Sequence, residues 1–241
     1  MQAPSRIHMT RTRLSSTSIV SMILIVLVGI AVTSDNKQTR AQSNCRTFNE
    51  TGHEVCNDFL DYWYQHGALA QQGFPISDEL SERSPTDGHA YTVQYFERAV
   101  FERHPEKAAP YNVLLSLLGV TYFQKKHPHP PSGQQSNTSA GSVYYPQTGH
   151  RLGGIFLDYW QNHGGLAQQG YPISEEFWEI SSQDCEKYLV QYFERAVFEY
   201  HPNNVGTPFV VLLSQLGTFQ HKEKYEPPPP VSTWGPQPGC R

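Results

Sequence analysis

The feature that most constrains the fold is a duplication. Residues 51–105 match residues 148–202 at a constant offset of 97 positions without a gap. About 35 of these 55 paired residues are identical, which unrelated segments do not reach by chance. The longest identical block is Val93–Glu102, which recurs as Val190–Glu199. The chain therefore contains one short module twice, and we place the two repeat modules at residues 47–121 and 145–221.

Each module is predicted to form a helix, a turn and a hairpin, in that order. An apolar stripe at helical spacing predicts a short helix that ends near Gly67: Val55, Phe59, Trp63 and His66. Residues 73–75 (Gly-Phe-Pro) then break the chain. Side chains alternate over residues 91–104, so we expect a β-hairpin that turns at residues 97–98. The predicted fold class is α+β, with two tandem repeats behind an N-terminal apolar helix.

The first 34 residues are typical of a signal peptide or an N-terminal membrane anchor. Arginines at positions 6, 11 and 13 precede an apolar stretch at residues 19–32, and no acidic residue occurs before position 35. The stretch is short for a spanning helix, which needs about 20 apolar residues, so a cleaved signal is favoured. We expect an extracellular or cell-surface protein that is membrane-tethered only if the signal is retained, with membrane contact through residues 19–32 alone. Residues 35–46 are interpreted as a spacer.

The charge of the exported part argues against nucleic acid as a partner. The full chain carries 18 basic and 22 acidic residues, a formal net charge of −4. Removing the three N-terminal arginines leaves 15 − 22 = −7. An acidic surface repels the phosphate backbone that dominates nucleic-acid affinity.

Four cysteines predict two disulfides, because exported proteins fold in oxidising surroundings. Three pairings are open, and we expect Cys45–Cys56 with Cys185–Cys240, since each would tie a terminal segment to the nearest folded element. The cysteines and histidines lack zinc-finger spacing, so neither a metal nor a cofactor is predicted.

Two segments have the composition of a linker and a tail. Residues 122–144 are rich in Pro, Ser, Gln and Gly, and residues 222–241 are rich in Pro. A linker of this length permits the two modules to pack on each other without requiring it. Each module alone is near the size where burial barely offsets chain entropy, which favours a shared core.

The module resembles the LGFP repeat, a family of exported bacterial proteins associated with cell-wall polysaccharide. The resemblance rests on the motifs at residues 51–53 (Thr-Gly-His), 63–67 (W-x-x-x-G), 73–79 and the hairpin that follows. The chain departs from the family pattern in both copies, with Gln72 and Gln169 in place of leucine and Ala99 and Ala196 in place of glycine. The resemblance implies binding of cell-wall polysaccharide.

Candidate ligand-binding residues are polar or aromatic and occur in both copies. Tyrosines and glutamates could line a groove in which a sugar ring stacks on an aromatic face while its hydroxyls reach a carboxylate. The hairpin tip adds a charged Glu-Arg pair. The candidates are Tyr62, Tyr159, Glu79, Glu176, Glu97, Glu194, Arg98 and Arg195. We interpret Trp63 and Trp160 as core residues instead.

Three functions remain open at this level. Recognisable catalytic motifs are absent, so the chain is not predicted to be an enzyme. The leading hypothesis is a non-enzymatic surface binding module for cell-wall polysaccharide, with two equivalent sites that provide avidity. The alternatives are a wall-polymer hydrolase that uses carboxylates such as Glu97 and Glu194, and a protein–protein adaptor of a surface system that docks through its Pro-rich tail.

Overall fold

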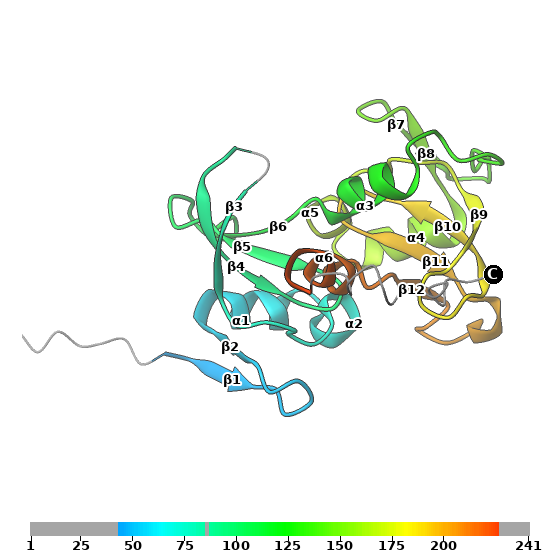
Figure 1. The fold of residues 1–241 in the computed structure, drawn as a ribbon. Helices are drawn as coiled ribbons and strands as arrows, with labels where there is room; N and C mark the ends of the chain where they lie inside the picture. Colours follow the sequence, from blue (N-terminus) through cyan, green and yellow to red (C-terminus); the bar gives the residue numbers. More distant parts are fainter. Residues whose placement is uncertain (1–42, 85–86, 227–241) are drawn as a thin grey trace, which may run out of the picture. The chain divides into compact units, whose positions relative to one another are not determined.

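The computed structural model describes residues 43–84 and 87–226, which all belong to one compact unit (Figure 1). The predicted signal or anchor, with its apolar residues 19–32, lies outside the described residues, as do most of the 35–46 spacer and residues 227–241 of the tail. Within the two described ranges, no helix is both long enough and apolar enough to span a bilayer.

Both repeats have the same order of strands and α-helices, so the predicted α+β class is confirmed. Repeat 1 consists of β1 (Cys45–Thr47), β2 (Glu54–Cys56), α1 (Asn57–Gln65), α2 (Ala68–Gln72), β3 (Leu80–Arg83), β4 (Ala90–Tyr95), β5 (Val100–Arg103), β6 (Val113–Leu115) and α3 (Leu118–Lys126). Repeat 2 consists of β7 (Val143–Tyr145), β8 (His150–Leu152), α4 (Gly154–Asn162), α5 (Gly165–Gln169), β9 (Phe177–Ile180), β10 (Lys187–Tyr192), β11 (Val197–Tyr200), a short 3-10 turn (Pro202–Asn204), β12 (Val211–Leu213) and α6 (Leu216–Tyr225).

The predicted hairpin is the centre of a larger sheet. Strands β4 and β5 pair antiparallel, and the main-chain N–H of Phe96 donates to the carbonyl of Ala99 across the turn. Strands β3 and β6 extend this pair into a four-stranded meander in the order β3-β4-β5-β6, and repeat 2 builds the matching sheet β9-β10-β11-β12. These outer strands have only three or four residues each, which is too short for a reliable alternation pattern in the sequence.

One face of each sheet packs on its own helix. In repeat 1, Phe59 and Trp63 of α1 meet Phe101 of β5, and the ring centroids of Phe59 and Phe101 are 5.8 Å apart. Trp63 is buried, as expected, and its indole N–H donates to the carbonyl of Gly73 at 3.0 Å. The helix begins at Asn57 rather than at Val55, because Val55 belongs to strand β2 of an N-terminal hairpin that the helical spacing had not distinguished.

The glycine of the predicted turn is required by its surroundings. Gly73 has a φ of +79°, a conformation that disfavours residues with a Cβ. A Cβ at this position would also lie 2.6 Å from the Cβ of Glu97 at the hairpin tip. Gly170 repeats the arrangement against Glu194, so the turn and the hairpin tip are packed together in both repeats.

The last helix of each repeat packs against the other repeat. The main-chain N–H of Val120 in α3 donates to the carbonyl of Glu194 in repeat 2 at 3.1 Å, and that of Thr218 in α6 donates to the carbonyl of Glu97 in repeat 1 at 3.1 Å. Figure 1 shows α6 beside the sheet of repeat 1, where it contacts β4. We call α3 and α6 the exchanged helices.

The exchanged helices lie in a core that both repeats share. Its buried side chains come from the second face of each sheet and from both helices: Val93, Tyr95, Val100, Leu118, Phe177, Val190, Tyr192, Val197 and Leu216. The alternative that the sequence left open is therefore resolved, because the two repeats pack on each other. Neither repeat has its complete core without the helix of the other.

The structure places two predicted segment boundaries later in the chain. Helix α3 runs to Lys126, so the first residues of the predicted 122–144 linker are helical, and Gln135 in the same segment bridges to Glu176. Helix α6 runs to Tyr225, past the predicted start of the tail at residue 222. In both cases the ends of the exchanged helices are polar, and their composition resembles that of a loop.

The Cys45–Cys56 disulfide is confirmed, and it joins β1 to β2. The second predicted pair, Cys185–Cys240, includes Cys240, which lies outside the described residues.

Candidate functional site

The tyrosines predicted to bind a ligand lie between the repeats. Tyr62 is buried and donates its hydroxyl to Gln168 of repeat 2 at 3.3 Å. Tyr159 accepts a hydrogen bond from the amide of Gln71 of repeat 1 at 2.7 Å. Burial raises the pKa of Tyr62 to about 12, against the opposing effect of the Arg195 charge. Burial also raises the pKa of Tyr159. Both rings therefore contribute to the contact between the repeats.

The predicted charged pair at each hairpin tip is bonded to the main chain. The Glu97 carboxylate accepts from the N–H of Phe74 at 3.1 Å, and Glu194 accepts from the N–H of Tyr171 at 3.0 Å. Their neighbours Arg98 and Arg195 donate to main-chain carbonyls of α2 and α5 at 3.2 and 3.3 Å. The two glutamates thus tie the hairpin tip to the turn, and the two arginines tie it to the short helix before the turn.

The remaining two predicted residues are also engaged within the protein. Glu79 forms a two-point ion pair with Arg103, with distances of 2.7 and 2.9 Å. Glu176 accepts from the amide of Asn137 at 2.7 Å, and burial raises its pKa against the effect of that bond. None of the eight predicted ligand-binding residues lines the cavity described next.

A cavity of about 300 Å³ lies in repeat 1, on the sheet face that turns toward the shared core. This volume is at the lower end of the range found for small-molecule sites. We call it the repeat-1 cavity. Its lining residues come from three strands, from the segments that follow β3 and β6, and from both exchanged helices: Glu82, Arg83, Ser84, Tyr91, Val93, Tyr95, Val100, Glu102, Ser116, Leu117, Leu118, Thr121, Gln220 and Lys224.

The meander explains why these residues meet. In the antiparallel register, Val93 stands opposite Glu102 on β5, and Tyr95 stands opposite Val100, so these four side chains share one face of the sheet. The exchanged helices lie along the same face, with Leu118 and Thr121 from α3 and Gln220 and Lys224 from α6. The cavity thus has an apolar floor and a polar rim, and repeat 2 supplies part of the rim.

One carboxylate of the cavity, Glu82, is surrounded by hydrogen-bond donors. Lys224 and Tyr225 of α6 both donate to it, and the Tyr95 hydroxyl donates at 3.0 Å. Burial alone would raise the pKa of Glu82, but the bonds from Lys224, Tyr225 and Tyr95 outweigh it and hold the pKa below its usual value. Glu82 is therefore anionic at neutral pH.

The second carboxylate, Glu102, accepts a hydrogen bond from the Ser116 hydroxyl. The Nε2 atom of His104 lies 3.7 Å from the other oxygen of Glu102. Ser116 thus donates to a carboxylate and not to an imidazole, which is the wrong order for a serine nucleophile that needs a histidine base. The two carboxylates lie on β3 and β5, which flank β4 on either side.

Tyr91 stands at the rim in a fixed orientation. Its ring packs against His104 with centroids 4.1 Å apart, and its hydroxyl donates to Asp87 at 2.6 Å. The bond to Asp87 raises the pKa of Tyr91 to about 12. Tyr91 therefore stays protonated and presents a rigid aromatic ring to the cavity.

Repeat 2 has the same site, but it is filled. Its counterpart cavity has about 10 Å³ and is lined by the equivalent residues of repeat 2, including Glu179, Tyr192 and Glu199. The space is taken by Tyr122 of α3 and Phe219 of α6, whose rings stack with centroids 5.4 Å apart. The Tyr122 hydroxyl bonds to Ser182 at 2.9 Å. Tyr122 corresponds to Gln220, and Phe219 corresponds to Thr121, each 98 positions apart.

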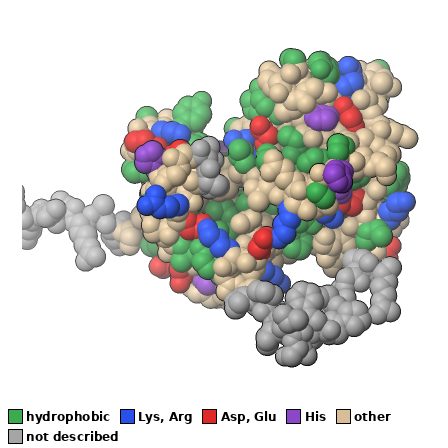
Figure 2. Space-filling view, turned by 45° about the horizontal axis from the view of Figure 1, so that its top comes forward, with side chains coloured by type: hydrophobic (Ala, Val, Ile, Leu, Met, Phe, Trp, Pro, Cys, Tyr) green, Lys and Arg blue, Asp and Glu red, His purple; other side chains and the backbone are tan. Residues whose placement is uncertain are grey.

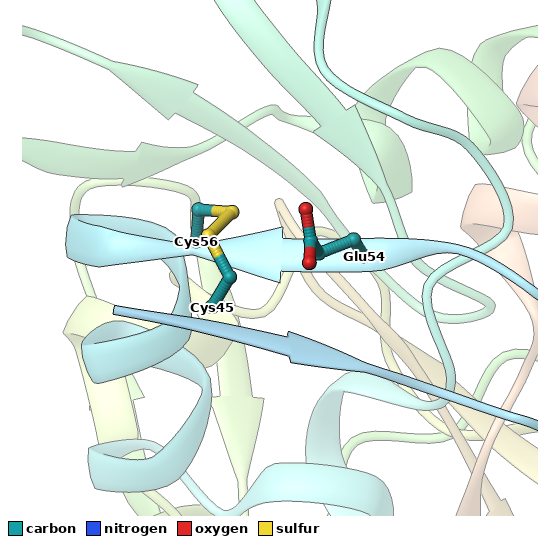
Figure 3. A group of neighbouring side chains, drawn as sticks. All are labelled: Cys45, Glu54 and Cys56. Atoms are coloured by element: carbon teal, nitrogen blue, oxygen red, sulfur yellow. A yellow bond between two sulfur atoms is a disulfide. The ribbon is translucent and has the colours of Figure 1, made fainter. Parts of the chain in front are cut away.

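A group of potential metal ligands proves to be structural. Cys45, Glu54 and Cys56 bring two sulfurs and a carboxylate within 4.8 Å of one another (Figure 3). Both sulfurs belong to the disulfide, so they are not available as thiolates, and a metal of the zinc class would retain only one ligand from this group.

No family model matches the chain, and no curated protein or solved structure matches it. The resemblance to the LGFP repeat therefore stays a prediction.

A comparison of the two copies can point to this cavity through the positions where they differ, and not through the positions where they are identical. The predicted ligand-binding residues are duplicated, and duplication also preserves the residues that hold the fold. The cavity depends on two positions where the copies differ in size, Thr121 against Phe219 and Gln220 against Tyr122. Both lie beyond residue 105, outside the gap-free match.

Proposed function

We propose that this protein is a non-enzymatic binding module of the cell surface or extracellular space, and that its ligand is cell-wall polysaccharide held in the repeat-1 cavity. The observation that carries the proposal is the composition of that cavity. Tyr91 offers aromatic surface, valines form the floor, and Thr121 and Gln220 offer hydroxyl and amide groups. Sugar rings have apolar C–H faces and polar edges, which match this combination.

Binding at this position involves one ligand per chain and not two. The sequence hypothesis assumed two equivalent sites, but Tyr122 and Phe219 occupy the space in repeat 2. Avidity for a repetitive polymer then requires several copies of the chain on one surface, since one chain presents one site. The export signal predicted at residues 1–34 supports the location.

The hydrolase alternative has less support in the cavity. A glycosidase needs a general acid whose pKa is raised, together with a second carboxylate. The pKa of Glu82 is instead lowered by its hydrogen bonds with Lys224, Tyr225 and Tyr95. Glu97 and Glu194, which the sequence offered for this role, are bonded to main-chain N–H groups of the turns.

Retention of the full chain on isolated bacterial cell wall tests the proposal. We expect retention above that of an unrelated protein of similar charge, and a loss of at least about tenfold in affinity for the double variant Thr121→Phe/Gln220→Tyr. This variant gives repeat 1 the side chains that fill repeat 2, so the fold is known to accommodate them. The proposal fails if the wild-type chain is not retained, or if the variant is retained equally well.

The variant must be folded for this result to count. Its thermal unfolding transition, followed by circular dichroism, is expected to be as cooperative as that of the wild-type chain. A second control is Glu176→Gln, which changes a duplicated glutamate outside the cavity and should leave retention unchanged.

A further inference from the structure

The charged groups of the repeat-1 cavity are balanced. Its lining contains two carboxylates, Glu82 and Glu102, and two cations, Arg83 and Lys224, so that the formal charge is 2 − 2 = 0. On the face drawn in Figure 2, cationic and acidic side chains are likewise interspersed, and neither sign gathers into one patch. The lining residues therefore carry no excess of either charge sign.

The charged groups also have partners within the protein. Lys224 and Tyr225 donate to Glu82, Ser116 donates to Glu102, and the Arg83 guanidinium donates to the carbonyl of Gly88 at 2.9 Å. A cationic ligand that bound Glu82 would have to compete with Lys224. An anionic ligand that drew Lys224 away would leave Glu82, whose side chain is 11% exposed, without its cation. Leaving a mostly buried carboxylate without its cation is unfavourable.

The lining also has uncharged polar groups that can bond a ligand without disturbing an ion pair. Thr121 and Gln220 line the cavity from the two exchanged helices, and Gln220 can both donate and accept. Val93 and Val100 are buried and form an apolar floor, and Tyr91 stands beside it. A flat molecule with hydroxyl groups on its edge and no charge satisfies all of these contacts without disturbing an ion pair.

We infer that the repeat-1 cavity selects uncharged sugar units, such as hexoses or N-acetylhexosamines, and excludes uronic acids and phosphate-bearing glycans. This inference rests on the proposed function and names the ligand class of the same site. Recognition depends on shape, on hydrogen bonds to hydroxyls and on the Tyr91 ring, and the ion pairs of the cavity fix the side chains in place.

The test is a titration of the full chain with four defined polymers at two salt concentrations. Chitin oligosaccharide and dextran are neutral, whereas polygalacturonate and poly(glycerol phosphate) are anionic. We expect at least one neutral polymer to bind, with an affinity that changes less than about twofold between 50 and 500 mM NaCl, because no net charge is involved. The variant Thr121→Phe/Gln220→Tyr should lose at least about tenfold.

The opposite results separate the two proposals. In one contrary result, the anionic polymers bind with an affinity that salt lowers at least about tenfold, and the double variant abolishes that binding. The neutral ligand class is then wrong, while the cavity remains the site. If a neutral polymer binds equally well to the variant, the cavity is not the site, and the inference falls. If none of the four polymers and no isolated cell wall is bound, the proposed function falls and the inference with it.

Discussion

The two repeats share their fold, yet only one of them keeps an open cavity of about 300 Å³ on the inner face of its sheet. The other has about 10 Å³ at the same place. The strands that form both floors are nearly identical, with Val93, Tyr95 and Val100 in repeat 1 matched by Val190, Tyr192 and Val197 in repeat 2. The difference arises on the exchanged helices. Thr121 and Gln220 line the open cavity, and the aromatic residues Phe219 and Tyr122 occupy the corresponding positions at the filled one. A site can thus be opened or closed in a duplicated fold without any change in the sheet that carries it.

The largest expected effect concerns the close approach of the exchanged helices, which both repeats need. A Cβ on Gly217 would lie 1.9 Å from the carbonyl oxygen of Phe96, and a Cβ on Gly119 would lie 1.8 Å from that of Phe193. These are main-chain atoms, so the helices would have to move. We expect Gly217→Ala and Gly119→Ala each to lower the free energy of unfolding by about 3 kcal/mol or more, despite the better helix propensity of alanine. Urea unfolding measures the loss.

Gly52→Ala serves as the control for these variants. Gly52 also has a positive φ, of +76°, but a Cβ there meets nothing within 4 Å. Its cost should be limited to backbone strain of about 1 kcal/mol. If Gly217→Ala and Gly119→Ala cost no more than this control, the packing of the exchanged helices is not as described.

A second difference between the repeats is the disulfide. Cys45 and Cys56 link the first hairpin of repeat 1, whereas Ser142 and Gly153 hold the equivalent positions in repeat 2. There Arg151 donates to the carbonyl and hydroxyl of Ser142 instead. The loop closed by the disulfide spans 11 residues. We therefore expect the variant Cys45→Ser/Cys56→Ser to lower the free energy of unfolding by slightly less than about 3 kcal/mol, the size that loop-closure entropy gives. Thermal unfolding of the variant measures this, and an unchanged transition would contradict it.

The exchanged helices carry much of what the sequence could not show. The central hairpin, the Gly-Pro turn and the first helix follow from local patterns within a few residues. The contact of α3 with Glu194 and of α6 with Glu97 joins residues that are far apart in the chain, and no periodicity encodes such a partner. The polar ends of these helices also resembled a linker and a tail, since Lys125, Lys126 and Lys224 face ion-pair partners and not an apolar core.

The site was harder to predict than the fold for a physical reason. Duplication of Glu97 and Arg98 suggests a functional role, but Glu97 bonds to the main chain of the turn and Arg98 bonds to the main chain of α2. A cavity forms where side chains leave space unfilled. Here that space depends on Thr121 and Gln220, and neither residue type by itself indicates a binding site. Comparison with Phe219 and Tyr122 at the matching positions shows that the side chains at these two positions differ in size between the open and the filled site.

Opening the filled site should produce a second binding site. The variant Tyr122→Gln/Phe219→Thr gives repeat 2 the side chains of repeat 1. We expect it to lose about 1–2 kcal/mol of unfolding free energy, since the stacked rings are only partly buried, and to bind two ligands per chain. Titration calorimetry gives the number of sites. A folded variant that still binds one ligand would show that these two aromatic residues are not what closes repeat 2.

The smallest effect concerns the matched carboxylates. Glu82 bonds to Lys224 and Tyr95, and Glu179 bonds to Lys126 and Tyr192 at 2.7 Å each. Glu82→Gln should lower the unfolding free energy by about 0.5–1 kcal/mol at pH 7 and also weaken ligand binding. Glu179→Gln should lower stability without weakening binding, because the counterpart cavity that Glu179 lines holds only about 10 Å³. Urea unfolding measures the stability of both variants, and titration calorimetry measures their affinity for the ligand.

The stability effect of Glu82→Gln should depend on pH in one direction. The pKa of Glu82 is lowered in the folded protein, so the ionised form stabilises the fold above the unfolded value of 4.5. That contribution is lost as the pH falls through the folded pKa. Unfolding curves of the variant and the wild-type chain should therefore converge in acid. A difference that stays constant from pH 7 to pH 3 would mean that the charge of Glu82 does not contribute.

The number of ligands bound by one wild-type chain tests the central claim most directly. Isothermal titration with a neutral wall oligosaccharide measures that number without any change to the protein. The open cavity of repeat 1 and the filled one of repeat 2 predict one ligand per chain. Two ligands of equal affinity per chain would contradict this account, because the duplicated fold would then bind through a surface that both repeats present.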